Sequence, residues 1–353
     1  MKLLVSETWK YFWYGQVLVD RFRELGVAAS EFKEGVFFDQ HDGLRRSKLL
    51  AIPYRLQRKF RWGPAVKRLN QSLLDRAAAF SADAVLLVRG EMVLPETLSE
   101  LRSRGTIVVG MNNDNAFSDH YPKYAWRHLR AGIPDYDQYF AYRQSDIKHY
   151  RDHGCPKVDL LRSYYIREMH FPVDDQSSED KQFDVAFIGH WEDDGRDKYI
   201  EALLNDGRIR LGLFGSNWHK SPIYDRISQQ LGHVAPVYGS DYNDVLNRAK
   251  IGLVFLSKIN NDTYTRRAFE IPATRTMMLS EYTDDLNSLF AEGKECEYFR
   301  SPDEMMEKAQ FYISQRKARE RIAAASYRRV QSDGHEAIDR ARQILAAIHE
   351  FNN

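Results

Sequence analysis

Residues 251–282 constrain the fold of this chain more than any other stretch. An apolar run at 251–256 leads into a polar loop, then a short helix-like segment that opens near Thr265, then a second apolar run at 276–279. The order strand, loop, helix, strand predicts half of a doubly wound α/β unit. In such sheets, ligands lie beyond the carboxyl ends of the strands, where helix N-termini also point. We therefore expect a ligand site in this connection.

Asp262, Arg266, Arg267 and Glu270 all fall in this one connection. A helix would place Arg267 and Glu270 on one face, because they are three residues apart. A carboxylate there can accept two hydrogen bonds from a ribose diol, and guanidinium groups suit a diphosphate. The predicted ligand is a nucleotide with phosphates. The alternative, which the local spacing alone favours, is an i,i+3 surface ion pair; Pro272 keeps any helix here short or kinked.

The run RRAFEIPATRTMMLSE, followed by DDLNSLFAEGKECEYFRSPDEM, resembles the C-terminal half of the CgeB-like (spore-maturation type) glycosyltransferases over residues 183–335. The resemblance implies an α/β protein with two Rossmann-like doubly wound domains facing a cleft, the GT-B fold. More distantly, Asp262 and Glu270 match the Glu-x7-Glu element of retaining GT-B enzymes, which implies that Glu270 binds the donor. The chain departs from the pattern with Asp at the first acidic position and with Arg275 where a small residue is usual.

Length and composition favour two domains in a reducing compartment. A chain of 353 residues fits an N-terminal domain at 1–171, a polar linker at 172–182, a donor domain at 183–335 and a tail at 336–353 long enough to return to the first domain. Lys plus Arg (51) nearly balances Asp plus Glu (50), which argues against a general polyanion binder. The two cysteines are far apart, and the N-terminus reads as a strand, so we expect a cytoplasmic protein.

Glycines and polar residues follow the apolar runs of the predicted donor domain. A glycine at a strand end lets the backbone approach a ligand, and basic residues at a helix start suit phosphate. The resemblance implies that Arg196 helps to bind the diphosphate, although a Gly–Arg pair at such a turn is common. The predicted donor contacts, besides Glu270, are Gly189, His190, Arg196, Gly215, Tyr242, Thr265 and Arg266.

An aromatic loop follows the first predicted strand, residues 2–6. Trp9, Tyr11 and Trp13 of this loop could stack on the rings of an acceptor sugar, or they could fill the gap between strand and helix. Glu7 is the one carboxylate in the loop. It is a candidate general base, and the alternative is a solvated side chain.

Two further acidic residues follow predicted strands of the first domain. Glu91 comes after the run 84–88, and Asp114 lies in the sequence NNDN after the run 106–110. Because carboxyl ends of parallel strands meet at one edge, both are candidate acceptor contacts. For Asp114, ordinary turn chemistry is an equal alternative.

Residues 43–68 carry nine Lys and Arg and no acidic residue, with apolar residues interleaved at roughly helical spacing. Such a surface can lie on an anionic membrane or hold an anionic acceptor. The alternative is a solvated helical face. We do not expect nucleic-acid binding, because no nucleic-acid module accompanies the patch.

These features predict a transferase that moves a sugar from a nucleotide-diphosphate sugar to a carbohydrate or lipid-linked acceptor. We expect no cofactor and no metal, because the paired aspartates at 193–194 and 284–285 form no DxD motif. Asp262 and Arg267 are the predicted catalytic residues of a retaining enzyme; inversion would need a base such as Glu7 or Asp114. The alternatives are a binding protein that has lost turnover and, less favoured, a nucleotide-sugar 2-epimerase.

Overall fold

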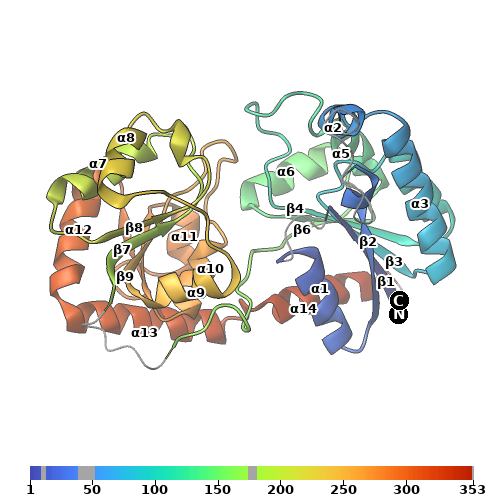
Figure 1. Ribbon diagram of the computed structural model, residues 1–353. Helices are drawn as coiled ribbons and strands as arrows, with labels where there is room; N and C mark the ends of the chain where they lie inside the picture. The colour runs from blue at the N-terminus through green and yellow to red at the C-terminus, as the bar shows by residue number, and fades with distance from the viewer. Residues whose placement is uncertain (9–12, 39–51, 174–180, 352–353) are drawn as a thin grey trace. The chain divides into compact units, whose positions relative to one another are not determined.

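The computed structural model describes residues 1–8, 13–38, 52–173 and 181–351 (Figure 1). The chain forms two compact units, Met1–Arg162 with Ala337–Asn353, and Ser163–Glu336. The unit boundary thus falls at Ser163, ahead of the stretch 172–182 that the composition indicates as a linker. Residues 163–171 belong with the second unit.

The first unit contains a six-stranded parallel sheet in the order β2-β1-β3-β4-β5-β6. Its strands are β1 (Lys2–Glu7), β2 (Ala28–Lys33), β3 (Ala84–Val88), β4 (Ile107–Asn112), β5 (Gln138–Ala141) and β6 (Val158–Leu160). Its helices are α1 (Gly15–Glu24), α2 (Ile52–Phe60), α3 (Pro64–Phe80), α4 (Pro95–Ser103), α5 (Arg127–Gly132), α6 (Gln144–Asp152) and α14 (Ala337–His349), with short 3-10 turns at Glu34–Phe37 and Ile133–Asp135.

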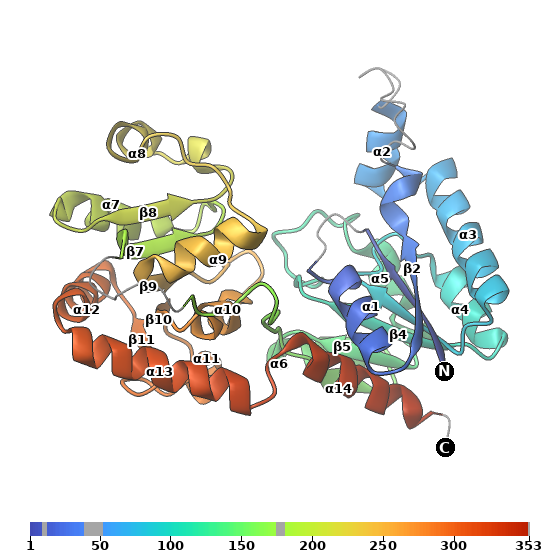
Figure 2. The ribbon, with the colours of Figure 1, turned by 60° about the horizontal axis from the view of Figure 1, so that its bottom comes forward.

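Two apolar layers cover the faces of this sheet. Side chains of α3 and α4, including Leu69 and Leu98, bury one face. The helices α1 and α14 lie beside each other over the opposite face (Figure 2), where Phe22 and Ile344 are fully buried. The C-terminal helix α14 therefore contributes to the core of the first unit, because its apolar residues recur at helical spacing on one side.

The second unit contains a five-stranded parallel sheet in the order β11-β10-β9-β7-β8. Its strands are β7 (Phe183–Ile188), β8 (Leu211–Phe214), β9 (Ala249–Val254), β10 (Met277–Glu281) and β11 (Glu297–Phe299). Its helices are α7 (Arg196–Asp206), α8 (Tyr224–Leu231), α9 (Gly239–Asn247), α10 (Arg267–Ala273), α11 (Asp284–Leu289), α12 (Pro302–Ser314) and α13 (Arg316–Ser332), with a 3-10 turn at Trp218–Lys220.

Both sheets reverse their strand order at one point. In the first unit the reversal lies between β1 and β3, and in the second it lies between β7 and β9. In doubly wound sheets, ligands bind beyond the carboxyl ends of the strands at this reversal. The topology therefore selects two edges, one in each unit, as candidate sites.

Two segments of the second unit are shorter or less regular than their neighbours. Residues 234–238 lie outside the sheet, and α9 begins directly after them at Gly239. The helix that the sequence predicts near Thr265 is α10, only seven residues long, with Pro272 at its sixth position. Proline donates no backbone hydrogen bond, so the helix ends one residue later.

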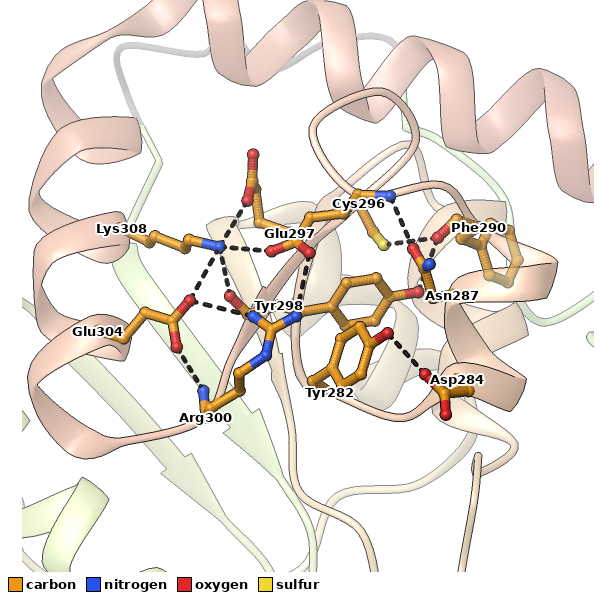
Figure 3. A network of polar contacts seen from close by, with 11 residues as sticks. Tyr282, Asp284, Asn287, Phe290, Cys296, Glu297, Tyr298, Arg300, Glu304 and Lys308 are labelled. Atoms are coloured by element: carbon orange, nitrogen blue, oxygen red, sulfur yellow. Dashed lines mark hydrogen bonds and ion pairs between the residues drawn. The ribbon is translucent and has the colours of Figure 1, made fainter.

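A polar network joins the loop after α11 to β11 and α12 (Figure 3). Lys308 Nζ lies 2.7 Å from Glu292 Oε1, 3.0 Å from Glu297 Oε2 and 2.6 Å from the carbonyl oxygen of Tyr298. The hydroxyl of Tyr298 donates to the carbonyl of Phe290 at 2.7 Å. This network fixes the segment FAEGKE against the edge of the sheet, so its role is structural.

None of the helices in the described part of the chain has both the length and the apolar composition that crossing a bilayer requires.

Candidate functional site

The carboxyl edge of the second sheet brings two glycines into direct contact. Gly189 follows β7 and donates its N–H to the carbonyl of Phe214, the last residue of β8, at 2.8 Å. Gly215 has φ +148°, and a Cβ placed on it would lie 1.9 Å from the carbonyl oxygen of Gly189. The indole N–H of Trp218 donates to that same oxygen at 2.9 Å. The turns after β7 and β8 therefore pack backbone against backbone, which the missing side chain of Gly215 allows.

Arg267 lies against this backbone. Its Nε donates to the carbonyl of Ile188, and a Cβ on Gly189 would lie 3.1 Å from its Nη2. Its guanidinium is also 5.9 Å from the ring of Phe187. Among the described residues, Nε is the only guanidinium nitrogen of Arg267 with a protein acceptor. The sheet edge thus holds one side of the guanidinium and leaves Nη1 and Nη2 as donors.

Glu270 is buried deeper, with 1% of its surface exposed. Its Oε2 accepts a hydrogen bond from the hydroxyl of Tyr242 at 2.6 Å, and its Oε1 lies 2.5 Å from Arg266 Nε. His170 Nε2 lies 3.5 Å from the same Oε1. The carboxylate therefore has partners from α9, from α10's start and from the segment before β7.

The electrostatics of this cluster follow from burial and pairing. Burial by itself raises the pKa of Glu270, but Arg266, His170 and the Tyr242 hydroxyl outweigh it and hold that pKa below its usual value. Burial lowers the pKa of His170 to about 4, so the ring is neutral at pH 7. Its Nδ1 accepts the N–H of Ile166 at 2.9 Å, which places the ring proton on Nε2, facing Glu270. The cluster is a carboxylate–guanidinium pair with one neutral donor, the Tyr242 hydroxyl, and with the neutral ring of His170 beside it.

The predicted contact between Glu270 and a donor ribose stays a prediction. In this structure Oε2 accepts the Tyr242 hydroxyl, whereas Oε1 lies at ion-pair distance from Arg266 and accepts no hydrogen bond from the described residues. The i,i+3 surface pair between Arg267 and Glu270 is not formed. Arg267 instead reaches back to Ile188, while Arg266 pairs with Glu270 at i,i+4 spacing.

Arg196 is engaged within its own loop. Its Nε and Nη2 donate to the two carboxylate oxygens of Asp194 at 2.8 and 2.6 Å, and its Nη1 donates to the carbonyl of His190 at 2.6 Å. With 5% of its surface exposed, it fixes the turn between β7 and α7. The side chain of His190 is half exposed and lies 2.7 Å from Glu192. A direct contact between Arg196 and a diphosphate stays a prediction.

The loop between β9 and α10 holds the other predicted residues of this unit. Asp262 is half-buried, and its N–H donates to the carbonyl of Ser257 at 2.9 Å. Thr265 is half-buried and accepts the N–H of Ala268 at 3.0 Å. Both residues thus lie at the carboxyl edge, in the connection that the sequence selected.

Sequence reasoning did not select His170 or Glu281 for the site. His170 precedes β7, and no local pattern connects it with α10. Glu281 ends β10, and its carboxylate accepts the N–H of Leu256 at 2.6 Å and lies 3.1 Å from Lys258 Nζ. The sequence does mark Glu281, because it is an acidic residue at the end of a buried apolar run.

The carboxyl edge of the first sheet carries a charged cluster of its own. Arg89, which follows β3 and has φ +74°, lies 3.0 Å from Glu91 and contacts Asp114 after β4. Arg61 lies 3.2 Å from the same oxygen of Glu91. The guanidinium of Arg89 is 5.0 Å from the ring of Trp126. The predicted acceptor residues Glu91 and Asp114 are thus bridged by one strained arginine.

Two further carboxyl groups lie at this edge. Glu7 is 2% exposed rather than solvated, and its Oε2 accepts the N–H of Gly15 at the start of α1 at 2.9 Å. Burial raises the pKa of Glu7 to about 7. Glu34 accepts the Ser6 hydroxyl at 2.8 Å, and burial raises its pKa to about 8. A carboxyl that titrates near neutrality suits a general base.

Of the three aromatic residues that we expect to contact the acceptor sugar, the structure describes only one. Trp13 is half-buried, and Trp9 and Tyr11 lie outside the described residues. Within the described ranges, no group of three His, Cys, Asp or Glu side chains could hold a metal ion.

Comparisons with known proteins agree with this architecture. Residues 196–346 match the model of a family described as glycosyl transferase-like. No protein of curated function matches the chain in sequence. The fold is similar to that of a sucrose-phosphate synthase from Thermosynechococcus elongatus, with a TM-score of 0.72 and 11% identity over 99% of both chains.

Two further solved structures cover nearly the whole chain. HepE from Anabaena, in complex with UDP-glucose, has a TM-score of 0.68 and 12% identity over 99% of this chain and all of its own. A putative UDP-N-acetylglucosamine 2-epimerase from Listeria monocytogenes has a TM-score of 0.62 and 12% identity over 100% of this chain and 97% of its own. The chain therefore has the GT-B fold, with a glycosyl transferase-like sequence in residues 196–346.

Proposed function

We propose that the protein is a glycosyltransferase that moves a sugar from a nucleotide-diphosphate sugar to a carbohydrate or lipid-linked glycan acceptor. The observation that carries this proposal is the position of Arg267, whose guanidinium lies against the backbone of Ile188 and Gly189 at the strand-order reversal of the second sheet. The glycosyl transferase-like match spans this residue.

The chemistry of sugar transfer gives Arg267 its role. When the sugar leaves the nucleotide, negative charge grows on the diphosphate, and a prepositioned guanidinium lowers the energy of that state. The Nη donors of Arg267 match two phosphate oxygens, and the close packing of Gly215 against the carbonyl of Gly189 fixes the backbone beside them. We assign Asp262 to the reacting side of the same loop.

The proposed reaction retains configuration and needs no metal. A retaining enzyme requires no general base in the first unit. For an inverting reaction, Glu7 is the better-placed of the two predicted bases, because its pKa of about 7 lets it take a proton at neutral pH, whereas Asp114 is paired with Arg89. Trp13 and Glu91 are the proposed acceptor contacts among the described residues.

Similar folds point to the donor to test first. HepE was solved with UDP-glucose and with UDP, so a UDP-sugar is our first candidate donor. The putative 2-epimerase has the same architecture, which keeps an epimerase as the second candidate. A protein that binds the nucleotide sugar without turnover is the third.

A thermal-shift screen tests the proposal. We expect one of UDP, GDP, dTDP, ADP and CMP to raise the melting temperature, with no dependence on magnesium, because a ligand that binds only the folded state stabilises it. Arg267→Ala should weaken binding of that nucleotide about tenfold or more through loss of a charge-assisted phosphate contact. Arg226→Ala, which removes a half-exposed arginine that pairs with Glu201, is the matched control.

Product analysis separates the three candidates. A transferase hydrolyses its nucleotide sugar slowly in the absence of acceptor, an epimerase exchanges sugar isomers, and a binding protein does neither. If no nucleotide shifts the melting temperature, the proposed donor site is wrong.

A further inference from the structure

Helix α2 presents an apolar stripe to solvent. Ile52, Leu56 and Phe60 recur every four residues and are 45%, 49% and 43% exposed, and Trp62, just beyond the helix, is 70% exposed. No residue of α2 is buried. Large apolar side chains gathered in this way on a folded protein mark an interaction surface. We call these four residues the α2 stripe.

The orientation of α2 is fixed from its opposite side. Gln57 Oε1 accepts the N–H of Ala65 at the start of α3 at 2.7 Å, and Tyr54 packs against the apolar core of the first unit. The ring of Phe60 lies 5.2 Å from that of Tyr124. In Figure 2, α2 stands beside α3 in the first unit. Ile52 and Leu56 therefore face outward because Gln57 and Tyr54 hold the other side of the helix, while Phe60 contacts Tyr124 and stays 43% exposed.

Basic residues border the stripe. Arg55 and Lys59 are exposed on α2, each about one helical turn after a stripe residue, Ile52 or Leu56. Lys67 and Arg68 are exposed on α3. No acidic residue occurs between 52 and 68. The local charge is strongly positive on a chain whose formal net charge is only +1.

We infer that the α2 stripe and its basic border bind an anionic lipid surface. Ile52 and Leu56 gain nothing from a nucleic acid, which would contact the basic residues alone, whereas both gain from insertion at the boundary between headgroups and acyl chains. Arg55 and Lys59 then meet the lipid phosphates. Trp62 suits the same boundary, because an indole ring combines an apolar body with a polar N–H.

This surface lies in the first unit and shares no residue with the nucleotide site of the second. Lipid binding can therefore prove wrong while the proposed transferase function holds. Equally, lipid binding can be confirmed while the transferase function proves wrong. A lipid-bound enzyme would meet lipid-linked acceptors at high local concentration, which is the kind of acceptor that the proposed function includes.

Co-sedimentation with lipid vesicles tests the inference on the full chain. We expect the protein to pellet with phosphatidylcholine vesicles that contain phosphatidylglycerol, and to stay in the supernatant with phosphatidylcholine alone. Added salt should weaken binding, because exposed charges are screened. The double variant Leu56→Asp with Phe60→Asp should reduce binding about tenfold or more. Arg55→Glu with Lys59→Glu should reduce it by about fivefold or more for each charge.

The controls separate lost binding from lost folding. Phe311→Asp changes an equally exposed side chain, 50% exposed on α12, and should bind like the wild type. Circular dichroism melts should be nearly unchanged, because none of the substituted side chains is buried and Phe60 gives up only a half-exposed contact with Tyr124. A wild-type protein that ignores anionic vesicles overturns the inference, and so does undiminished binding by the Leu56/Phe60 variant. Equal binding to neutral vesicles overturns the role of the basic border.

Discussion

At the scale of single residues, Glu270 is best understood as an anchor for Arg266. A carboxylate that is 1% exposed and paired at 2.5 Å fixes the guanidinium at the start of α10, and Tyr242 and His170 fix the carboxylate in turn. Such a residue acts on a ligand through its partner. If Glu270 binds the donor ribose directly, its loss should weaken nucleotide binding independently of Arg266. The anchoring role and the ribose-binding role of Glu270 can therefore be separated by experiment.

A double-mutant cycle separates them. We expect Glu270→Gln to lower stability by about 2–4 kcal/mol, because it leaves the Arg266 cation without its buried counter-charge. If Glu270 acts through Arg266, the losses in nucleotide affinity of Glu270→Gln and Arg266→Gln will not add. The readout is the dissociation constant of the nucleotide found in the screen, measured by calorimetry.

The control pair is Glu201 with Arg226, which lie 3.1 Å apart on a partly exposed surface of the same unit. Their substitution to Gln should leave nucleotide affinity unchanged. If the losses at Glu270 and Arg266 add, and the Glu270 loss disappears with a 2′-deoxyribose nucleotide, Glu270 binds the ribose itself.

Glu34 makes the stability of the first unit depend on pH. Its pKa is about 8 in the folded protein, above the ordinary value of 4.5, because the carboxyl group is buried. Between these values the folded state binds the proton and the unfolded state releases it, so stability falls as pH rises from about 4.5 to 8, by at most about 1.4 kcal/mol per pH unit. Glu7, with a pKa of about 7, adds to the same slope up to that pH.

Glu34→Gln tests this sign. The amide keeps an acceptor for the Ser6 hydroxyl but has no proton to lose, so the melting temperature should fall less between pH 5 and pH 8 than it does in the wild type. An equally steep fall in the variant would show that Glu34 is ionised in the folded protein. Glu31→Gln, a partly exposed acid on β2, is the control.

At the scale of elements, the contact between the ends of β7 and β8 shapes the donor edge. Gly215 has φ +148°, where side chains are strained, and the carbonyl of Gly189 occupies the space of a Cβ. The two turns can approach only because Gly215 lacks a side chain.

Gly215→Ala should therefore destabilise the second unit by about 3 kcal/mol or more, or push the two turns apart and weaken nucleotide binding. Thermal melts and nucleotide titrations measure the two effects. Gly207→Ala is the control: it also has positive φ, +66°, but open space around the added Cβ, so about 1 kcal/mol is expected. Equal effects at both positions would mean that the Gly189 contact is unimportant.

At the scale of the whole molecule, the first unit is discontinuous in sequence. Helix α14 completes the layer over its sheet beside α1, with Ala341, Ile344 and Ile348 fully buried. Burying these side chains stabilises the unit by roughly 1.5–3 kcal/mol for each large residue. The first unit therefore needs the last helix of the chain, which is made after the whole second unit.

The sequence by itself determined the alternation of strands and helices, the two parallel sheets and the edge on which the charged loop lies. These features follow from local periodicity and from glycines at strand ends, which act over a few residues. It also indicated the exposed character of α2, because a basic run with helical apolar spacing has few ways to be buried.

Only the tertiary structure decided which charged groups meet. The sequence spacing allowed Glu270 to pair with Arg267, but packing of α10 sent Arg267 to the carbonyl of Ile188 and gave Glu270 to Arg266. His170 reaches Glu270 from the segment before β7, which no local pattern connects with α10. Burial of a charge depends on contacts between distant segments, and for that reason the pKa values of Glu7 and Glu34 were also beyond the reach of local pattern.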